Sequence, residues 1–191
     1  MDFFIPIFTN CVNDFFLLGL SIFIFALAIT LNKHKLQRIS IYLILSAIVS
    51  GIAFITIKII TGELRPFLVL ENVNQLVSVG SPLTFPSGHT TSAFAFASTI
   101  ALTYKIKIKN YSFNSGWIAY PIAIFMGVSR IYVGVHYPFD VLVGAIIGFL
   151  SAYIMIKLGD KYLKDDIYSL KVAVAVILIL ILYICFIYVN I

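Results

Sequence analysis

The chain has 191 residues, of which 61% are hydrophobic and only 11% are charged, and its mean hydropathy is +1.06. Because a soluble domain carries roughly 25% charged residues, this composition excludes an ordinary water-soluble protein. The formal net charge is +5, but the basic residues stand in short clusters between long apolar runs, which is typical of membrane-facing loops and not of a nucleic-acid-binding protein. We expect one membrane-embedded domain over residues 1–191.

Six apolar stretches approach the roughly 20 residues that a membrane-spanning helix requires. They predict an all-α fold, an integral-membrane bundle of six transmembrane helices. The third and fourth stretches are the shortest. In chain order the predicted spans are Asn13–Leu31, Ile39–Ile60, His89–Tyr104, Ser115–Ser129, Phe139–Lys157 and Ser169–Asn190.

The loops between these spans are of two kinds, which six spans would place on opposite sides of the membrane. Residues 32–38, 105–114 and 158–166 are short, polar and basic, whereas residues 61–86 and 130–138 hold Gly, Pro and the unusual polar residues. Of the 13 Lys and Arg residues, ten lie on the first side and three on the second. Since cytoplasmic loops carry the excess of basic residues, we expect a multi-pass protein of the cell (cytoplasmic) membrane whose second set of loops faces the extracytoplasmic side.

One segment of the long outer loop has a pattern of its own. Apolar residues recur at helical spacing from Val69 to Val77, and Glu71, Asn72 and Gln75 take the other face. This pattern suits a short interfacial helix in the loop between the second and third spans, lying in the headgroup plane. A loop segment packed against the bundle would explain the same residues.

The three cations on the outer side fall next to other polar residues. Lys58 ends the second span, Arg65 follows seven residues later, and Arg130 closes the fourth span. Three converging cations repel one another unless they bind a multiply charged anion, and Arg matches the forked geometry of phosphate oxygens. The sequence PSGH opens the third span, so Ser87 and Gly88 would add a hydroxyl and a helix N-terminus that favours an anion.

Two histidines and a carboxylate supply the reactive groups that hydrolysis of a bound phosphate would need. One helical turn would bring Asp140 to a ring nitrogen of His136, which fixes the tautomer and stabilises positive charge if the other nitrogen attacks phosphorus. His89 would protonate the leaving oxygen and later activate water. This scheme predicts phosphate hydrolysis with no cofactor and no metal ion. Taken singly, each residue has a structural explanation: interfacial anchor, loop or helix cap.

These residues resemble the three-part signature of the type-2 phosphatidic acid phosphatase superfamily, which includes lipid phosphatases and polyprenyl diphosphate phosphatases. All three parts occur in order, within a motif-bearing core of about residues 39–158. They are Lys58-x6-Arg65-Pro66, Pro86-Ser87-Gly88-His89 and Ser129-Arg130-x5-His136-x3-Asp140.

The resemblance implies roles for the same residues. His136 would be the nucleophile, Asp140 its partner and His89 the acid and base. The phosphoryl group would be held by Lys58, Arg65, Ser87, Gly88 and Arg130.

The expected activity is that of a membrane lipid phosphatase, a hydrolase of phosphoric esters or anhydrides. The expected partner is a membrane lipid that bears a phosphate or diphosphate. We expect no nucleic-acid partner. An outward-facing site suits recycling of a carrier lipid, so a polyprenyl diphosphate of the undecaprenyl or dolichyl type is favoured. Phosphatidylglycerophosphate, phosphatidate and lipid A are the alternatives. A vanadium haloperoxidase-like enzyme and a transporter are remoter ones, because the former are typically soluble and the latter place ionisable residues near the bilayer midplane.

Overall fold

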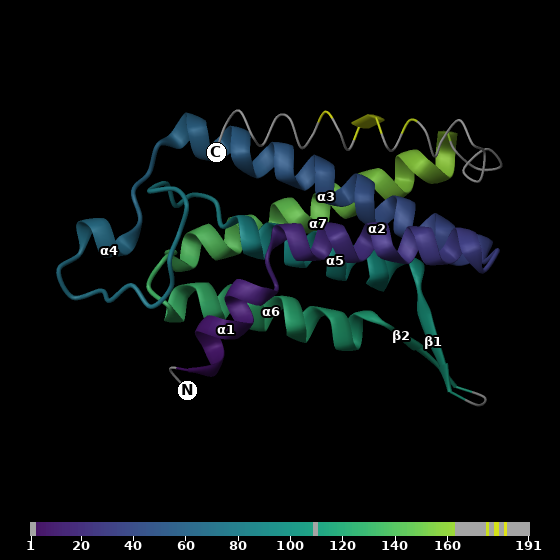
Figure 1. Ribbon diagram of the computed structural model, residues 1–191, viewed down its shortest axis with the longest axis horizontal. Coiled ribbons are helices and arrows are strands. Elements are labelled where there is room, and N and C mark those ends of the chain that lie inside the picture. The colour runs from purple at the N-terminus through teal and green to yellow at the C-terminus, as the bar shows by residue number, and fades with distance from the viewer. Residues whose placement is uncertain (1–2, 109–110, 163–174, 176–177, 180–181, 183–191) are drawn as a thin grey trace.

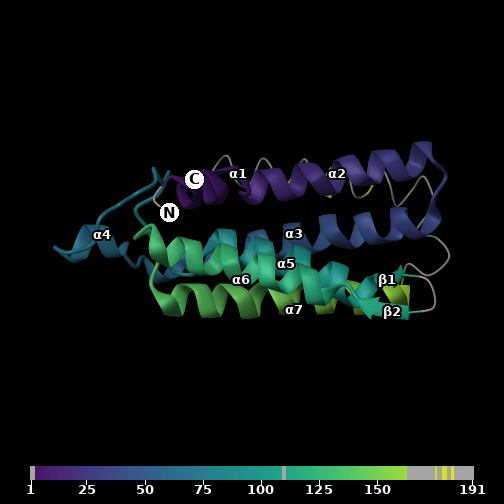
Figure 2. The ribbon, with the colours of Figure 1, turned by 90° about the horizontal axis from the view of Figure 1, so that it is seen from below.

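The computed structural model is a bundle of helices whose axes run side by side, with α4 and long loops at one end and a β-hairpin at the other (Figures 1 and 2). The structure describes residues 3–108, 111–162, 175, 178–179 and 182. Within them the elements are α1 (Phe4–Cys11), α2 (Asp14–Thr30), α3 (His34–Thr61), α4 (Pro66–Val69), α5 (Gly88–Thr103), β1 (Lys105–Ile108), β2 (Tyr111–Asn114), α6 (Gly116–Tyr132) and α7 (Pro138–Tyr162).

Helix α5 lies at the centre of the bundle, in contact with α2, α3, α6 and α7. Small residues allow the closest of these contacts. A Cβ atom at Gly148 of α7 would lie 2.2 Å from the carbonyl oxygen of Thr91 on α5, and one at Gly144 would lie 2.8 Å from that of Ser87. Both distances are shorter than any real contact, so only glycine lets the two helices meet here. This packing sets the start of α5 beside the start of α7.

The predicted helix over Val69–Val77 is wrong. The only helix in this loop is the single turn of α4, and residues 70–82 form neither a helix nor a strand. Instead, the backbone N–H of Leu76 donates to the carbonyl of Val133 at 3.1 Å, and Gly134, at φ +76°, has the Asn74 carbonyl where a Cβ would stand. The segment is therefore the packed loop that the same pattern also allowed, because it packs against the α6–α7 turn and does not continue as a helix.

The predicted connection over residues 105–114 is a second difference, since it forms a β-hairpin in an otherwise helical fold. The strands β1 and β2 pair antiparallel, with Lys105 opposite Asn114 and Ile108 opposite Tyr111. The sequence KIKI alternates polar and apolar residues with a period of two, which favours a strand over a helix.

The number of membrane spans is supported in part. Within the described residues, α3 and α7 are long and apolar enough to cross a membrane, and α1 with α2 adds a third if their 53° bend lies inside one span. Helices α5 and α6 have 16 and 17 residues, fewer than the roughly 20 of a typical span. The predicted span Ser169–Asn190 lies almost wholly outside the described residues. The count of six therefore stays a prediction.

The α5–α7 contact can be tested with a matched pair of glycines. Gly148→Ala puts a methyl group against the Thr91 carbonyl, and we expect the free energy of unfolding to fall by about 1–3 kcal/mol, as in other overpacked interiors. Gly19 on α2 has nothing within 4 Å of its would-be Cβ, so Gly19→Ala should leave stability unchanged or raise it slightly. Thermal unfolding in detergent measures both, and equal melting temperatures for the two variants would contradict the packing.

Candidate active site

A cavity of about 480 Å³ opens at the end of the bundle where α3 ends and α5 begins. It brings together residues from distant parts of the chain: six of the eight predicted site residues line it. Ser87 and Asp140 lie directly behind this lining, joined by a hydrogen bond from the Ser87 N–H to the Asp140 carbonyl at 3.1 Å. The six lining residues are Lys58, Arg65, Gly88, His89, Arg130 and His136.

His136 stands in the short α6–α7 turn and is only 4% exposed. Its Nδ1 lies 3.2 Å from Oδ2 of Asp140, and its Nε2 lies 3.3 Å from Nη1 of Arg65. A guanidinium group donates hydrogen bonds but accepts none, so Nε2 is the accepting nitrogen and Nδ1 carries the proton. The ring thus has its lone pair on the Arg65 side, and its Nδ1–H donates a hydrogen bond to Asp140.

Burial lowers the pKa of His136 to about 3, and the positive charges of Arg65, Lys58 and Arg130 act in the same direction. The hydrogen bond to Asp140 opposes this change but is outweighed. At neutral pH the imidazole is therefore uncharged, which is the form that has a free lone pair. Burial also lowers the pKa of Arg65, to about 10, so this guanidinium remains protonated at pH 7.

The Asp140 carboxylate is held by more than its histidine partner. Its Oδ2 accepts from the Tyr137 N–H at 2.9 Å and from the Thr84 hydroxyl, which also lies 3.1 Å from Nδ1 of His136. Thr84 was not predicted as a site residue. It reaches the site because its N–H pairs with the Glu63 carbonyl at 2.8 Å, and sequence spacing gives no sign of that pairing.

Neutral oxygen atoms hold the three cations in place around the cavity. Lys58 donates to the carbonyls of Leu83 and Thr84, at 3.2 and 2.8 Å. Arg65 donates through Nε to Ser81 at 2.7 Å. Arg130 donates from Nη1 to the Thr9 hydroxyl at 2.9 Å, while its buried Nε has no hydrogen-bond partner in the part of the chain that the structure describes. These contacts are to neutral oxygens, so among the described residues only the nearby carboxylates of Asp14 and Asp140 offset the three cations, and the net positive charge favours an anion in the cavity.

The PSGH sequence supplies the N-terminus of α5, although not in every predicted detail. The helix begins at Gly88, which lines the cavity, so the N-terminus of α5 lies at the site. Ser87 differs from the expectation. Its hydroxyl is fully buried, accepts from the Thr90 hydroxyl at 2.9 Å and is not part of the lining. Ser87 therefore shapes the turn instead of reaching into the cavity.

The N-terminal helices add polar residues that the sequence did not reveal as site residues. The bend between α1 and α2 places Asn10, Asn13 and Asp14 in the cavity wall. Asp14 lies against the α5 start, since its Oδ2 would be 3.3 Å from a Cβ at Gly88. These residues sit at the start of an apolar stretch, where a polar side chain is ordinarily a helix cap; Asn13 is one, accepting from the Phe16 N–H at 2.9 Å.

The fold and the sequence agree on the family. The model of the PAP2 superfamily matches residues 39–164, and the chain belongs to this superfamily, as the three motifs predicted. The bacitracin transport permease protein BcrC of Bacillus licheniformis is 34% identical over 130 residues, which are 68% of this chain and 59% of the relative. The undecaprenyl-diphosphatase BcrC of Bacillus subtilis is 31% identical over 61% of this chain and 58% of the relative. The chain thus spans about three fifths of the length of these curated relatives.

Two solved structures share the fold. The crystal structure of Aquifex aeolicus LpxE aligns with a TM-score of 0.64 and 30% identity, over 82% of this chain and 85% of that one. A transmembrane PAP2-type phosphatidylglycerolphosphate phosphatase from Bacillus subtilis aligns with a TM-score of 0.63 over 84% and 77% of the two chains, at 21% identity. The second likeness concerns the fold alone. Together they agree with a helical membrane protein.

An oxyanion probe tests the charge of the cavity. We expect orthovanadate to raise the melting temperature of the purified protein by several degrees, since ligand at a hundred times its Kd stabilises by about 2.7 kcal/mol. Arg130→Gln should greatly reduce this shift because it removes one of the three cations. Arg38→Gln, at the far end of α3, is the control and should keep the full shift. An equal loss in both variants, or no shift in the wild type, would contradict an anion site here.

Proposed function

We propose that this protein is a membrane lipid phosphatase that works through a covalent phosphohistidine on His136. The observation that carries the proposal is the state of that ring: a neutral imidazole, protonated on Nδ1 toward Asp140, with Nε2 toward a cavity lined by three cations. An unprotonated ring nitrogen beside a positively charged cavity is the arrangement that phosphoryl transfer requires.

In the first step Nε2 of His136 attacks phosphorus and the bond from phosphorus to the leaving oxygen breaks. Arg65 turns its N–H from Nε2 to a phosphoryl oxygen as the nitrogen becomes engaged. Asp140 stabilises the positive charge that forms on the ring, and His89 gives its proton to the leaving oxygen. The lipid alcohol or lipid monophosphate then departs.

In the second step water attacks the phosphohistidine and the nitrogen–phosphorus bond breaks. His89, now neutral, takes a proton from the water, and inorganic phosphate leaves. In both steps negative charge spreads over the phosphoryl oxygens, where Lys58, Arg65, Arg130 and the start of α5 at Gly88 stabilise it. These groups provide the charge stabilisation that many phosphatases obtain from metal ions, so the route we propose uses no metal ion.

For the substrate we propose a polyprenyl diphosphate. Two relatives support this choice by name, the Bacillus subtilis protein and a 28% identical undecaprenyl-diphosphatase from Sulfolobus acidocaldarius. Phosphatidylglycerophosphate, phosphatidate and lipid A are second candidates. A lipid A 1-phosphatase of Porphyromonas gingivalis, 37% identical over 43% of this chain, supports lipid A by name. The clustering of polar groups at one end of the bundle favours an enzyme over a transporter.

We further propose six transmembrane helices in the cytoplasmic membrane, with the cavity at the extracytoplasmic face. The excess of Lys and Arg on the opposite side supports this orientation. It would give the enzyme access to carrier lipid whose diphosphate is exposed at the outer leaflet.

Replacing the nucleophile separates this mechanism from other uses of the same cavity. His136→Ala should lower phosphate release from a polyprenyl diphosphate by at least about a thousandfold. His34 is the first residue of α3, at the end of that helix away from the cavity, so His34→Ala should keep wild-type turnover. His89→Ala should slow the second step, so the phosphohistidine should accumulate. Because phosphohistidine is labile in acid and stable in alkali, an alkaline quench with labelled substrate should trap phosphorus on His136. Retained turnover in His136→Ala would overturn the assignment.

A further inference from the structure

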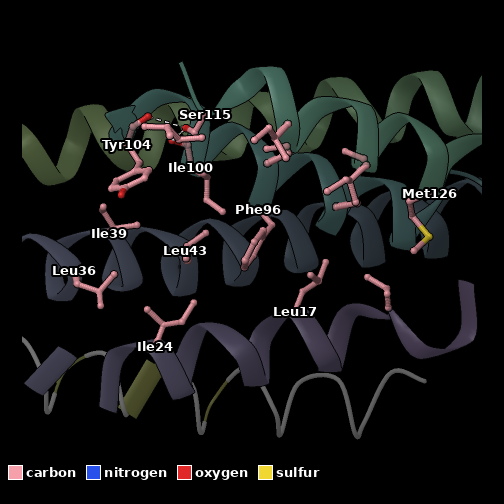
Figure 3. A pocket seen from close by; sticks show the side chains of 18 of the residues that line it. Leu17, Ile24, Leu36, Ile39, Leu43, Phe96, Ile100, Tyr104, Ser115 and Met126 are labelled. Atoms are coloured by element: carbon pink, nitrogen blue, oxygen red, sulfur yellow. Dashed lines mark hydrogen bonds between the residues drawn. The ribbon is translucent and has the colours of Figure 1, made fainter. Parts of the chain in front are cut away.

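A second cavity, of about 500 Å³, lies inside the bundle between α2, α3, α5 and α6 (Figure 3). Its lining is almost entirely apolar: Leu17 and Ile24 come from α2, Leu43 from α3 and Phe96 from α5. The Ser115 hydroxyl is among the few polar groups there, and it lies within hydrogen-bond distance of two backbone carbonyls, at 2.8 and 2.7 Å. The cavity therefore offers little to bind water or a headgroup.

This second cavity, an apolar groove, begins one helical turn from the candidate active site on the same faces of α5 and α6. Ala93 lies four residues after His89 on α5, and Met126 lies four residues before Arg130 on α6, so each pair shares a face. From these two positions the lining extends to Tyr104 and to Ser115. Eleven residues at 1.5 Å per residue give each wall a length of about 17 Å.

Small side chains make room in the groove, and α6 leaves its side open. Alanines line both facing helices, at Ala97 of α5 and at Ala119 and Ala123 of α6. Along the rim, Ile118 and Ile122 are 59% and 54% exposed. In a membrane such exposed isoleucines face lipid, so a hydrocarbon chain has a lateral path into the groove.

We propose that this groove holds the hydrocarbon chain of the enzyme's own lipid substrate, over about the first 17 Å beyond the phosphate. The proposal rests on the proposed phosphatase function. A chain that already lies in a bilayer gains no hydrophobic free energy by entering the groove, so the gain is positional. A hydrocarbon chain bound in the groove holds the phosphate close to His136 in a fixed orientation, and such proximity accelerates a reaction.

The test compares a long-chain polyprenyl diphosphate with dimethylallyl diphosphate, which is too short to enter the groove. Ala119→Phe fills the groove, and we expect it to lower the ratio of kcat/KM for the long substrate to that for the short one at least tenfold. Ala26→Phe places the same ring on the exposed side of α2 and should keep the wild-type ratio. Turnover of the short substrate reports separately that the phosphatase chemistry works.

An unchanged ratio in a folded, active Ala119→Phe protein would overturn the proposal, because the chain would then lie in bulk lipid. A second measurement does not depend on turnover. A prenyl phosphonate with a photoreactive group near the middle of its chain should label α5 or α6 within the groove, and Ala119→Phe should abolish that label. Labelling confined to outward-facing residues of α7, such as Phe149, would also overturn it.

A separate observation concerns Asp14, which the mechanism above leaves unused. Its Oδ1 is buried and has no hydrogen-bond partner within the described part of the chain, and it lines the same cavity as His89. The same lining holds the cations Arg130, Arg65 and Lys58, and among the described residues Asp14 is the one carboxylate in it. An imidazole among three cations resists protonation unless a carboxylate is near.

We infer that Asp14 is a positioning residue that keeps His89 ready to protonate the leaving group. This second inference also rests on the proposed function. It predicts a dependence on leaving group: an alkyl phosphate needs that proton, whereas p-nitrophenolate departs without it.

Asp14→Asn should therefore lower kcat for a long-chain alkyl phosphate at least tenfold and for p-nitrophenyl phosphate less than about threefold. Asp160→Asn, at the far end of α7, should treat both substrates alike. Equal losses on the two substrates in Asp14→Asn would show a merely structural role and overturn the inference. Failure of the wild type on both substrates would instead remove the proposed function.

Discussion

The site depends on one electrostatic constraint: three cations and two imidazoles share a partly buried cavity at one end of a membrane bundle. Backbone carbonyls fix Lys58 and Arg65, and a threonine hydroxyl fixes Arg130, so their charge is oriented but not neutralised. Burying net positive charge in this way is unfavourable unless an anion arrives. Binding of an anion would therefore relieve part of this cost, and in the mechanism that we propose the neutral His136 attacks the bound phosphoryl group.

Helix packing makes this constraint possible. Glycines of α7 let it pack closely against α5, which places Asp140 beside the PSGH turn. A hydrogen bond from the Ser87 N–H to the Asp140 backbone carbonyl connects the starts of the two helices. The loop between α3 and α5 then wraps over the site and contributes Thr84 and Arg65. Charge at one end and an apolar groove further along the same helices divide the bundle into two chemically different regions. One suits a phosphate and the other a hydrocarbon chain.

Sequence reasoning predicted the parts of the site that local chemistry determines. Lys58, Arg65, His89, Arg130 and His136 were singled out because ionisable residues are rare in so apolar a chain, and all five line one cavity. It missed Thr84 and Asp14, which reach the site only through a loop pairing and a helix bend. It also favoured a helix over Val69–Val77, because periodicity alone cannot show that this segment packs as a loop against the α6–α7 turn.

A structure of the orthovanadate complex tests the central claim most directly, because vanadate copies the trigonal-bipyramidal transition state of phosphoryl transfer. The account predicts vanadium bonded to Nε2 of His136, with Lys58, Arg65 and Arg130 on its equatorial oxygens and His89 on the opposite, apical side. Vanadate bound away from His136, or held with His89 on the same side as His136, would contradict it.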